Sequence, residues 1–92
     1  MIKIIATAST SHQLNSIRAF GLPVTNKMDG SFAINHWFAD REEAMRHLRS
    51  RAEKYNDEDP EGSDERLANM YADIERGALR LDAVTAYIEG DK

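Results

Sequence analysis

The apolar positions in the first part of this chain follow the pattern of extended strands. The run from Ile2 to Ser9 is rich in β-branched residues and ends in the Ser/Thr cluster STS, which is typical of a buried strand followed by a turn. In the segment 16–25, Gly21 and Pro23 disfavour a long helix and favour an extended, interrupted strand. The pattern therefore predicts strands over about 2–9 and 16–25.

A hairpin is predicted around Asp29 and Gly30. This dipeptide lies between two extended segments, and both residue types suit the positive φ angles of a two-residue turn. A third strand over about 31–38 follows, in which successive side chains alternate between two faces. One face carries Phe32, Ile34, His36 and Phe38. The other face carries Ala33, Asn35 and Trp37.

Two amphipathic helices are predicted after this strand. Over about 41–56 one apolar stripe repeats at helical spacing, and Asp40 with Glu43 three residues later forms a capping box at its start. Over about 64–77 a second apolar stripe follows the same spacing. We expect Ser63 or Asp64 to cap this second helix and Gly77 to mark its end.

The last residues fit either a strand or a short helix. Val84, Thr85, Tyr87 and Ile88 favour a strand, whereas Asp82 and Gly90 are suitable caps of a short helix. We choose a strand over 83–89. Residues 1–92 then form a single α+β domain, a two-layer sandwich with two helices packed on one face of an antiparallel sheet of three to four strands. The other face of the sheet is left free for binding.

Composition and charge narrow the classes of function. The chain has 92 residues, of which 41% are hydrophobic and 30% charged, so it is expected to form one packed core rather than a disordered segment. It has no cysteine, which excludes disulfides and cysteine-bound zinc. No apolar run reaches the roughly 18 residues of a membrane span, and no signal peptide is apparent. We expect a cytoplasmic protein whose net charge of −4 disfavours direct binding to nucleic acid or membranes.

The histidines give no support for a metal or catalytic site. No two of His12, His36 and His47 are four residues apart on one helix, and a calcium-loop count from Asp57 fails at position twelve, which is Ala68. His47 lies opposite the apolar stripe and is expected to be solvated, whereas His36 shares an apolar strand face and is expected to be partly buried. No cofactor is predicted. One enzymatic alternative stays open, a small metal-dependent hydrolase built from His12, His36 and a carboxylate.

The segment YNDEDPEGSDER, residues 55–66, is the most unusual stretch of the sequence. Between Asp57 and Glu65 it has six acidic residues and no basic one. It is either a solvated loop between helices or a patch that imitates nucleic-acid phosphate and binds a basic groove. Ser63 or Asp64 is assigned to capping, and Glu65 suits the dipole of the second helix. The acids without a structural role are Asp57, Glu58, Asp59 and Glu61.

Trp37 is a second candidate contact. It points away from Phe32, Ile34 and Phe38, so on an uncovered sheet face it would be a typical interface anchor. The alternative is that the C-terminal tail or the segment 21–24 packs over it.

Several segments together resemble a known family. The opening MIKII, the turn STSHQLN and the junction WFADREEA, followed by two amphipathic helices, are similar to small phage anti-CRISPR proteins. Those that block type I surveillance complexes resemble it most. The resemblance implies a non-enzymatic inhibitor that occupies the crRNA or DNA path, or a nuclease-recruiting surface, of such a complex.

The leading hypothesis is therefore a protein-binding inhibitor of phage or mobile-element origin that acts in the cytoplasm of a host cell. It would bind a basic, nucleic-acid-binding surface of a type I CRISPR–Cas complex through Asp57, Glu58, Asp59 and Glu61, with Trp37 as a further contact. A second hypothesis is a self-associating structural or regulatory module in which the Trp37 face forms a homodimer. The metal-dependent hydrolase is the third.

Overall fold

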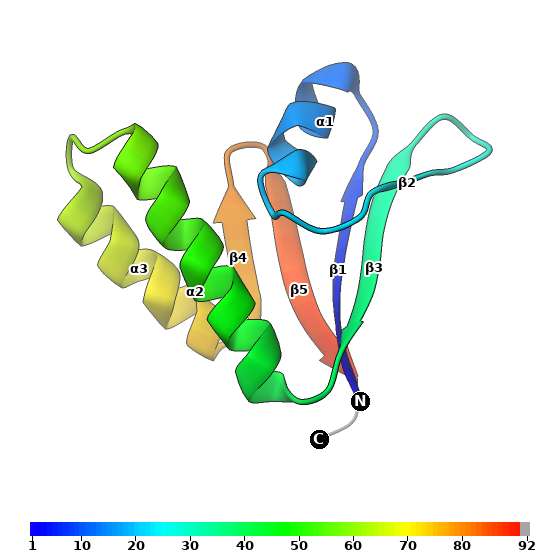
Figure 1. Ribbon diagram of the computed structural model, residues 1–92. Coiled ribbons are helices and arrows are strands. Elements are labelled where there is room, and N and C mark those ends of the chain that lie inside the picture. The colour runs from blue at the N-terminus through cyan, green and yellow to red at the C-terminus, as the bar shows by residue number, and fades with distance from the viewer. Residues whose placement is uncertain (91–92) are drawn as a thin grey trace.

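The computed structural model describes residues 1–90, in which one antiparallel sheet of five strands is combined with three helices (Figure 1). The α+β class is confirmed, whereas the expected numbers of two helices and three to four strands are too low. The strands are β1 (Ile2–Ala8), β2 (Thr25–Asn26), β3 (Phe32–Phe38), β4 (Ala78–Leu81) and β5 (Val84–Gly90). The helices are α1 (Ser11–Arg18), α2 (Arg41–Glu58) and α3 (Ser63–Glu75).

Strand β1 is the centre of the sheet, whose order is β2-β3-β1-β5-β4. Ile4 lies opposite His36 on β3 and opposite Ile88 on β5, and both pairings are antiparallel. Along β1 the side chains alternate, so Ile2, Ile4, Ala6 and Ala8 are buried while the residues between them point to the other face. The predicted first strand is therefore confirmed, with its apolar side toward the helices.

The hairpin at Asp29 and Gly30 is confirmed, but its turn differs from the prediction. The Lys27 amide donates to Ser31 O at 2.8 Å and the Gly30 amide donates to Lys27 O at 3.0 Å. Of the turn residues only Gly30 has a positive φ, +87°. This is a three-residue loop in which glycine provides the left-handed position, rather than a two-residue turn.

The prediction of a strand over 16–25 is wrong, because helix α1 occupies its first residues. Thr10 is the N-cap and accepts from the Gln13 amide at 3.2 Å, while Gln13 Oε1 accepts from the Ser9 amide at 2.9 Å. This reciprocal capping starts a helix whose Ile17 is fully buried. Gly21, at φ +67°, follows the end of the helix instead of interrupting a strand, and only Thr25–Asn26 joins the sheet.

Helices α2 and α3 agree with the predicted pair except at their facing ends and at the end of α3, which is Glu75, two residues before the predicted end at Gly77. The expected cap of α2 is present, since the Glu43 amide donates to Asp40 Oδ1 at 2.9 Å. Helix α2 continues two residues beyond the predicted end, to Glu58. At α3 the expected cap is wrong: Gly62, at φ +69°, takes the N-cap position without any side-chain hydrogen bond, and Ser63 and Asp64 lie inside the first turn.

The C-terminal strand is confirmed as β5, and a strand that was not predicted, β4, pairs with it. The two are joined by a two-residue turn, Asp82-Ala83, between the paired residues Leu81 and Val84. Asp82 has a φ of +56°, a conformation that costs a non-glycine residue free energy. Its carboxylate accepts from Ser16 Oγ at 2.8 Å, and this contact holds the turn against α1.

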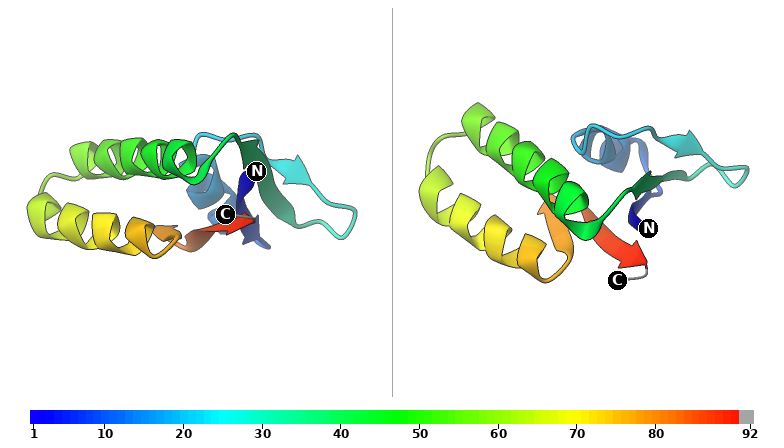
Figure 2. Two further views of the ribbon diagram at one scale, coloured as in Figure 1. Left: turned by 90° about the horizontal axis from the view of Figure 1, so that it is seen from below. Right: turned by 60° about the horizontal axis from the view of Figure 1, so that its bottom comes forward.

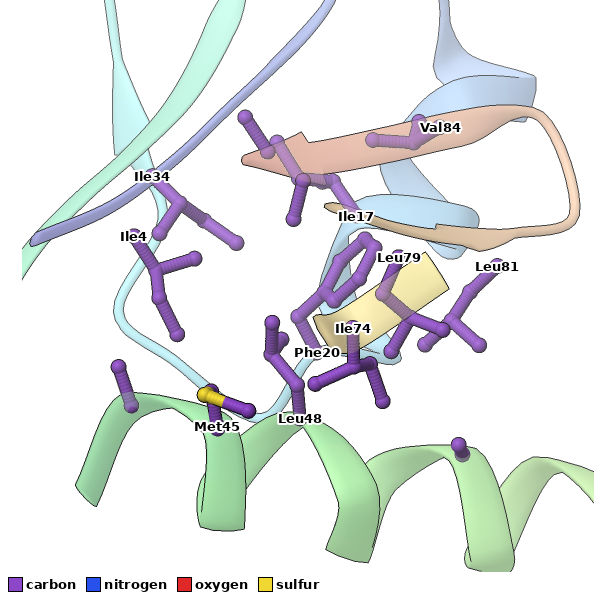
Figure 3. Packing of buried hydrophobic residues seen from close by; sticks show 14 of the residues in the cluster. Ile4, Ile17, Phe20, Ile34, Met45, Leu48, Ile74, Leu79, Leu81 and Val84 are labelled. Carbon is purple, nitrogen blue, oxygen red and sulfur yellow. The ribbon is translucent and has the colours of Figure 1, made fainter. Parts of the chain in front are cut away.

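The core lies between the sheet and the helices (Figure 3). Helices α1 and α2 cover one face of the sheet, while α3 packs beside α2 and against β4 (Figure 2). The largest fully buried side chains come from all layers and include Ile4, Ile17, Phe20, Ile34, Leu48, Ile74, Leu79 and Leu81. Burying each contributes roughly 1.5–3 kcal/mol. No helix within residues 1–90 is both long and apolar enough to cross a membrane.

Candidate functional site

The four acids without an assigned role lie together where α2 meets α3. We call Asp57, Glu58, Asp59 and Glu61 the acidic corner. Asp57 and Glu58 belong to the last turn of α2, Asp59 is its C-cap, and Glu61 lies in the short loop before α3. All four are exposed, and among the described residues none of them forms an ion pair. The structure therefore brings the predicted acids into one surface.

Arg66 holds the loop that carries the acidic corner. From the first turns of α3 its guanidinium donates to the carbonyl oxygens of Asp59 and of Glu61, the latter at 3.3 Å. It also donates to Asn56 Oδ1 at 2.7 Å. The first two bonds use the main chain of the loop, and all three leave the carboxylates of the acidic corner free. The loop is thus a closed, hydrogen-bonded turn rather than a loose linker.

Asn56 supports this loop from the buried side, and we call Arg66 and Asn56 together the clamp. Its side chain is buried, with Nδ2 donating to Ala52 O at 2.7 Å and contacting Met70 Sδ at 3.2 Å. A buried amide without partners would cost roughly 1–3 kcal/mol, so Asn56 is compatible with the core only while Arg66 occupies its oxygen. Neither residue was singled out from the sequence, because the predicted helix ended at Asn56 and no local pattern shows which group its amide contacts.

The acidic corner is electrostatically unfavourable for its own helix. Asp57 and Glu58 lie at the C-terminal end of α2, where the helix dipole is negative, and the last turn has no basic residue. Acids at this end each cost about 0.3–1 kcal/mol. By contrast, Asp64 and Glu65 lie in the first turn of α3, where the dipole favours them. The charges of Asp57 and Glu58 therefore oppose folding instead of supporting it.

The negative charge of the chain is concentrated in this region. The stretch 57–65 carries a formal charge of −6, whereas the whole chain carries −4, so the remaining residues are net positive by two. The acidic corner supplies four of those six charges. A partner approaching the molecule therefore meets a local negative field rather than a uniformly acidic surface.

Trp37 lies on the open face of the sheet. Its exposed fraction is 52%, and Tyr87, on the same face of the sheet but beyond β1 on β5, has the same value. Lys3 Nζ lies 5.2 Å from the centre of the indole ring, a cation–π contact. The segment 21–24 does not cover this face, since Leu22 and Val24 pack into the core on the helical side. Of the two predicted alternatives for Trp37, exposure is the one observed.

The acidic corner and Trp37 belong to separate surfaces. The α2–α3 turn lies at one end of the molecule, and β3 lies on the far side of the sheet from it (Figures 1 and 2). The molecule measures 39 × 33 × 16 Å, so its length is several times the screening distance of about 8 Å at physiological salt. The sequence prediction had grouped the two as contacts of one partner, and the fold does not bring them together.

The histidines form structural contacts. His36 is partly buried, as predicted, and its ring meets Phe38 edge-on at 5.1 Å. The prediction of a solvated His47 is wrong: its Nε2 is 2.6 Å from Phe20 O, and it must donate because a carbonyl only accepts. Four residues on, Arg51 Nε donates to Ala19 O at 2.9 Å. Together these side chains of α2 hold the segment after α1.

The grouping of Ser16, Asp82 and His12 does not have the geometry of a nucleophilic triad. Ser16 Oγ donates to Asp82 Oδ2 at 2.8 Å, and His12 Nε2 is 3.9 Å from the same oxygen. The carboxylate therefore lies between the other two groups, whereas a nucleophile needs the imidazole beside its hydroxyl. Ser16 is also only 4% exposed. Within residues 1–90 no three His, Asp or Glu side chains are close enough to hold a metal ion.

No protein-family model, no curated protein and no solved structure matches this chain. The resemblance to anti-CRISPR proteins accordingly stays an expectation from the sequence.

Proposed function

We propose that this protein is a non-enzymatic inhibitor that binds a basic, nucleic-acid-binding surface of a partner through Asp57, Glu58, Asp59 and Glu61. One observation carries the proposal. The four carboxylates are exposed and unpaired within the described chain, and they are presented on a turn that Arg66 clamps through main-chain oxygens. Two of them also reduce the stability of their own helix. A charge that opposes folding and has no structural partner is readily explained by binding.

The fixed turn favours recognition by arginine and lysine. A loop whose main chain is held in place loses little conformational freedom on binding, so less of the interaction energy is spent on ordering. Carboxylates on such a turn can accept the bidentate hydrogen bonds that a guanidinium otherwise makes to phosphate. Outside the contact, the local negative field accelerates association with a basic groove, over a distance of about 10 Å at 0.1 M salt.

The resemblance to phage anti-CRISPR proteins supports a type I surveillance complex as the partner. Such a complex holds crRNA and target DNA along basic surfaces, because the protein recognises the heteroduplex through its backbone. In this proposal the acidic corner occupies part of that path, and target DNA and the inhibitor exclude one another. Since β3 lies at the other end of the molecule, Trp37 is assigned to a different surface.

The test compares binding of three forms of the protein to a purified type I surveillance complex at low and at physiological salt. In the first variant, Asp57, Glu58 and Asp59 are replaced by lysine. The matched control replaces Asp29, Glu42 and Glu75 by lysine, which changes the net charge equally at other exposed positions. We expect the first variant to lose at least about tenfold in association rate and the control to bind nearly as the unaltered protein does.

The outcomes separate the parts of the proposal. Equal losses in both variants would mean that overall charge matters and the acidic corner does not. No binding of the unaltered protein to the surveillance complex would remove that partner. In that case, an affinity pull-down with the unaltered protein and the two variants as baits tests the acidic corner by itself. A host protein retained by the unaltered form and the control, and lost by the first variant, would support it.

A further inference from the structure

The outer edge of β3 has no partner strand over most of its length. Strand β2 pairs with β3 only through Thr25 opposite Ala33 and Asn26 opposite Phe32. Beyond Ala33, the segment 34–38 is bordered by β1 on one side only (Figure 1). An unpaired strand edge presents a row of free donors and acceptors that can add another strand.

The direction of the main-chain groups along β3 follows from the hairpin. Ser31 O accepts from Lys27, so the groups of Ser31 point outward, away from β1. Because these groups alternate along a strand, those of Ala33, Asn35 and Trp37 also point outward. Ala33 faces Thr25, whereas the outward main-chain groups of Asn35 and Trp37 have no hydrogen-bond partner among residues 1–90. The free edge therefore consists of the amides and carbonyls of these two residues.

This edge lacks the features that usually protect a strand edge. The sequence of the segment 34–38 is INHWF, without lysine, glutamate or proline, and its register with β1 is regular, with no bulge. The opposite edge of the sheet is different, because α3 packs against β4. The sheet is thus covered at one edge and open at the other, and the open edge is flanked by the exposed indole of Trp37.

We propose that this edge binds a second copy of the chain, by antiparallel pairing of β3 with β3 about a two-fold axis at His36. The two free residues lie on either side of His36, so the axis places Asn35 of each copy opposite Trp37 of the other. Such opposed pairs exchange both of their hydrogen bonds, giving about four main-chain bonds across the interface. The two five-stranded sheets then continue as one.

Charge complementarity favours a second copy over an arbitrary peptide. In this register the residues that follow β3 in one copy run toward the β2 side of the other. The first turn of α2 in one copy then lies at the same level along the strands as Lys27 of the β2–β3 hairpin in the other. This turn carries Glu43, which accepts from the Ala39 amide, and Glu42, whose carboxylate also pairs with Arg49 at 3.3 Å. The same attraction occurs twice by symmetry. The contact is distinct from the acidic corner, so this dimer does not depend on the proposed function.

The first test is sedimentation equilibrium from about 1 µM to 1 mM. Replacing Asn35 by proline removes an outward amide that is unused in the monomer and present twice in the interface, so the bonds to β1 are retained. We expect Asn35→Pro to raise the Kd of the dimer at least about tenfold. The control Asn35→Thr changes the side chain but keeps the amide, and its Kd is expected to remain within about twofold of the unaltered protein.

Hydrogen exchange of the unaltered protein provides a second measurement that does not depend on a variant's folding. The amides of Ile34 and His36, which point to β1, are expected to be protected at all concentrations. Those of Asn35 and Trp37 are expected to exchange fast when dilute and to become protected as the dimer forms. A monomer throughout the concentration range would overturn the inference. So would a dimer in which Asn35 and Trp37 continue to exchange fast.

Discussion

At the scale of single residues, a buried polar network defines the shape of the acidic corner. Asn56 and Arg66 are ten residues apart and come from different helices, yet each satisfies the other. The Arg66 guanidinium also lies 5.9 Å from the centre of the Tyr55 ring, a cation–π contact. The loop between the helices is therefore fixed from inside the protein and not by its own sequence.

Replacing Arg66 by methionine tests this network. Methionine keeps the length of the side chain but cannot donate, so Asn56 Oδ1 and two main-chain carbonyls lose their partner. We expect a loss of about 2–3 kcal/mol in the free energy of unfolding, measured with urea. Arg76→Met is the control, because the Arg76 side chain is 77% exposed and, among residues 1–90, its only ion pair is with Asp73. Its cost should stay below about 0.5 kcal/mol, and an equal loss in both variants would contradict the network.

Tyr71 links α3 to α2 by a hydrogen bond that depends on pH. Its hydroxyl donates to Glu53 Oε2 at 2.8 Å. Burial, followed by this bond to a carboxylate, raises the pKa of Tyr71 above 10.0. A raised pKa means that the stabilisation is fully present below the unfolded value and is lost as the pH rises through the folded value. The bond therefore contributes at neutral pH and disappears in alkaline solution.

The prediction is that Tyr71→Phe is less stable than the unaltered protein by about 1 kcal/mol at pH 8. Above pH 10 the difference should shrink. In the unaltered protein the unfolded state ionises this phenol at a lower pH than the folded state does, which favours unfolding, and the variant has no phenol there. Urea unfolding of both proteins between pH 8 and 11 gives the difference directly. The variant Glu53→Gln removes the negative acceptor, so the pKa of Tyr71 in this variant should lie closer to 10. A difference that is constant with pH would show that the pKa of Tyr71 is not raised in the folded protein.

At the scale of elements, the sequence predicted those strands and helices whose signals lie within a few neighbouring residues. The capping residues of α2, the alternation in β3 and the Asp-Gly turn are contained in a few neighbouring residues, and all three elements were found. Helix α1 was missed because Gly21 and Pro23 were given more weight than the pair Thr10 and Gln13. That pair is a recognisable capping signal, so this error was avoidable.

Other features depend on tertiary contacts that no local pattern shows. Strand β4 has only four residues and is defined by its pairing with β5. His47 and Arg51 are polar residues at helical spacing, and their role follows only from the chain segment 19–20 that crosses α2. The acidic corner was identified from the sequence, whereas the clamp beneath it was not. Charge is visible in a sequence, but the partner of a buried amide is a property of the fold.

The end of α2 provides a prediction for a whole element. Replacing Asp57 by asparagine and Glu58 by glutamine removes negative charge from the negative end of the dipole. Each change should stabilise the protein by about 0.3–1 kcal/mol at low salt. The matched pair Asp64→Asn and Glu65→Gln, at the start of α3, should destabilise it by a similar amount. Thermal unfolding at two salt concentrations measures both, and changes of the same sign would contradict the dipole argument.

At the scale of the whole molecule, the fold separates two surfaces with different chemistry. The acidic corner lies at the end formed by the two longer helices, and the open sheet edge lies at the other (Figure 1). A dimer formed through β3 would therefore carry two acidic corners pointing away from each other. Binding of one such corner would leave the second accessible, so a partner with two basic sites at a suitable distance would be held more tightly than one with a single site.

The position of α3 also sets a limit on assembly. In the terms of polymer chemistry, a building block with one reactive end can only form pairs, whereas one with two ends forms chains. Because α3 covers β4, this sheet has one reactive end. The Tyr71 bond and the Arg66 clamp that fasten α3 to α2 thereby act as a stopper. If α3 detached, β4 would become a second reactive end, and the same strand pairing that closes a dimer would propagate as a fibre.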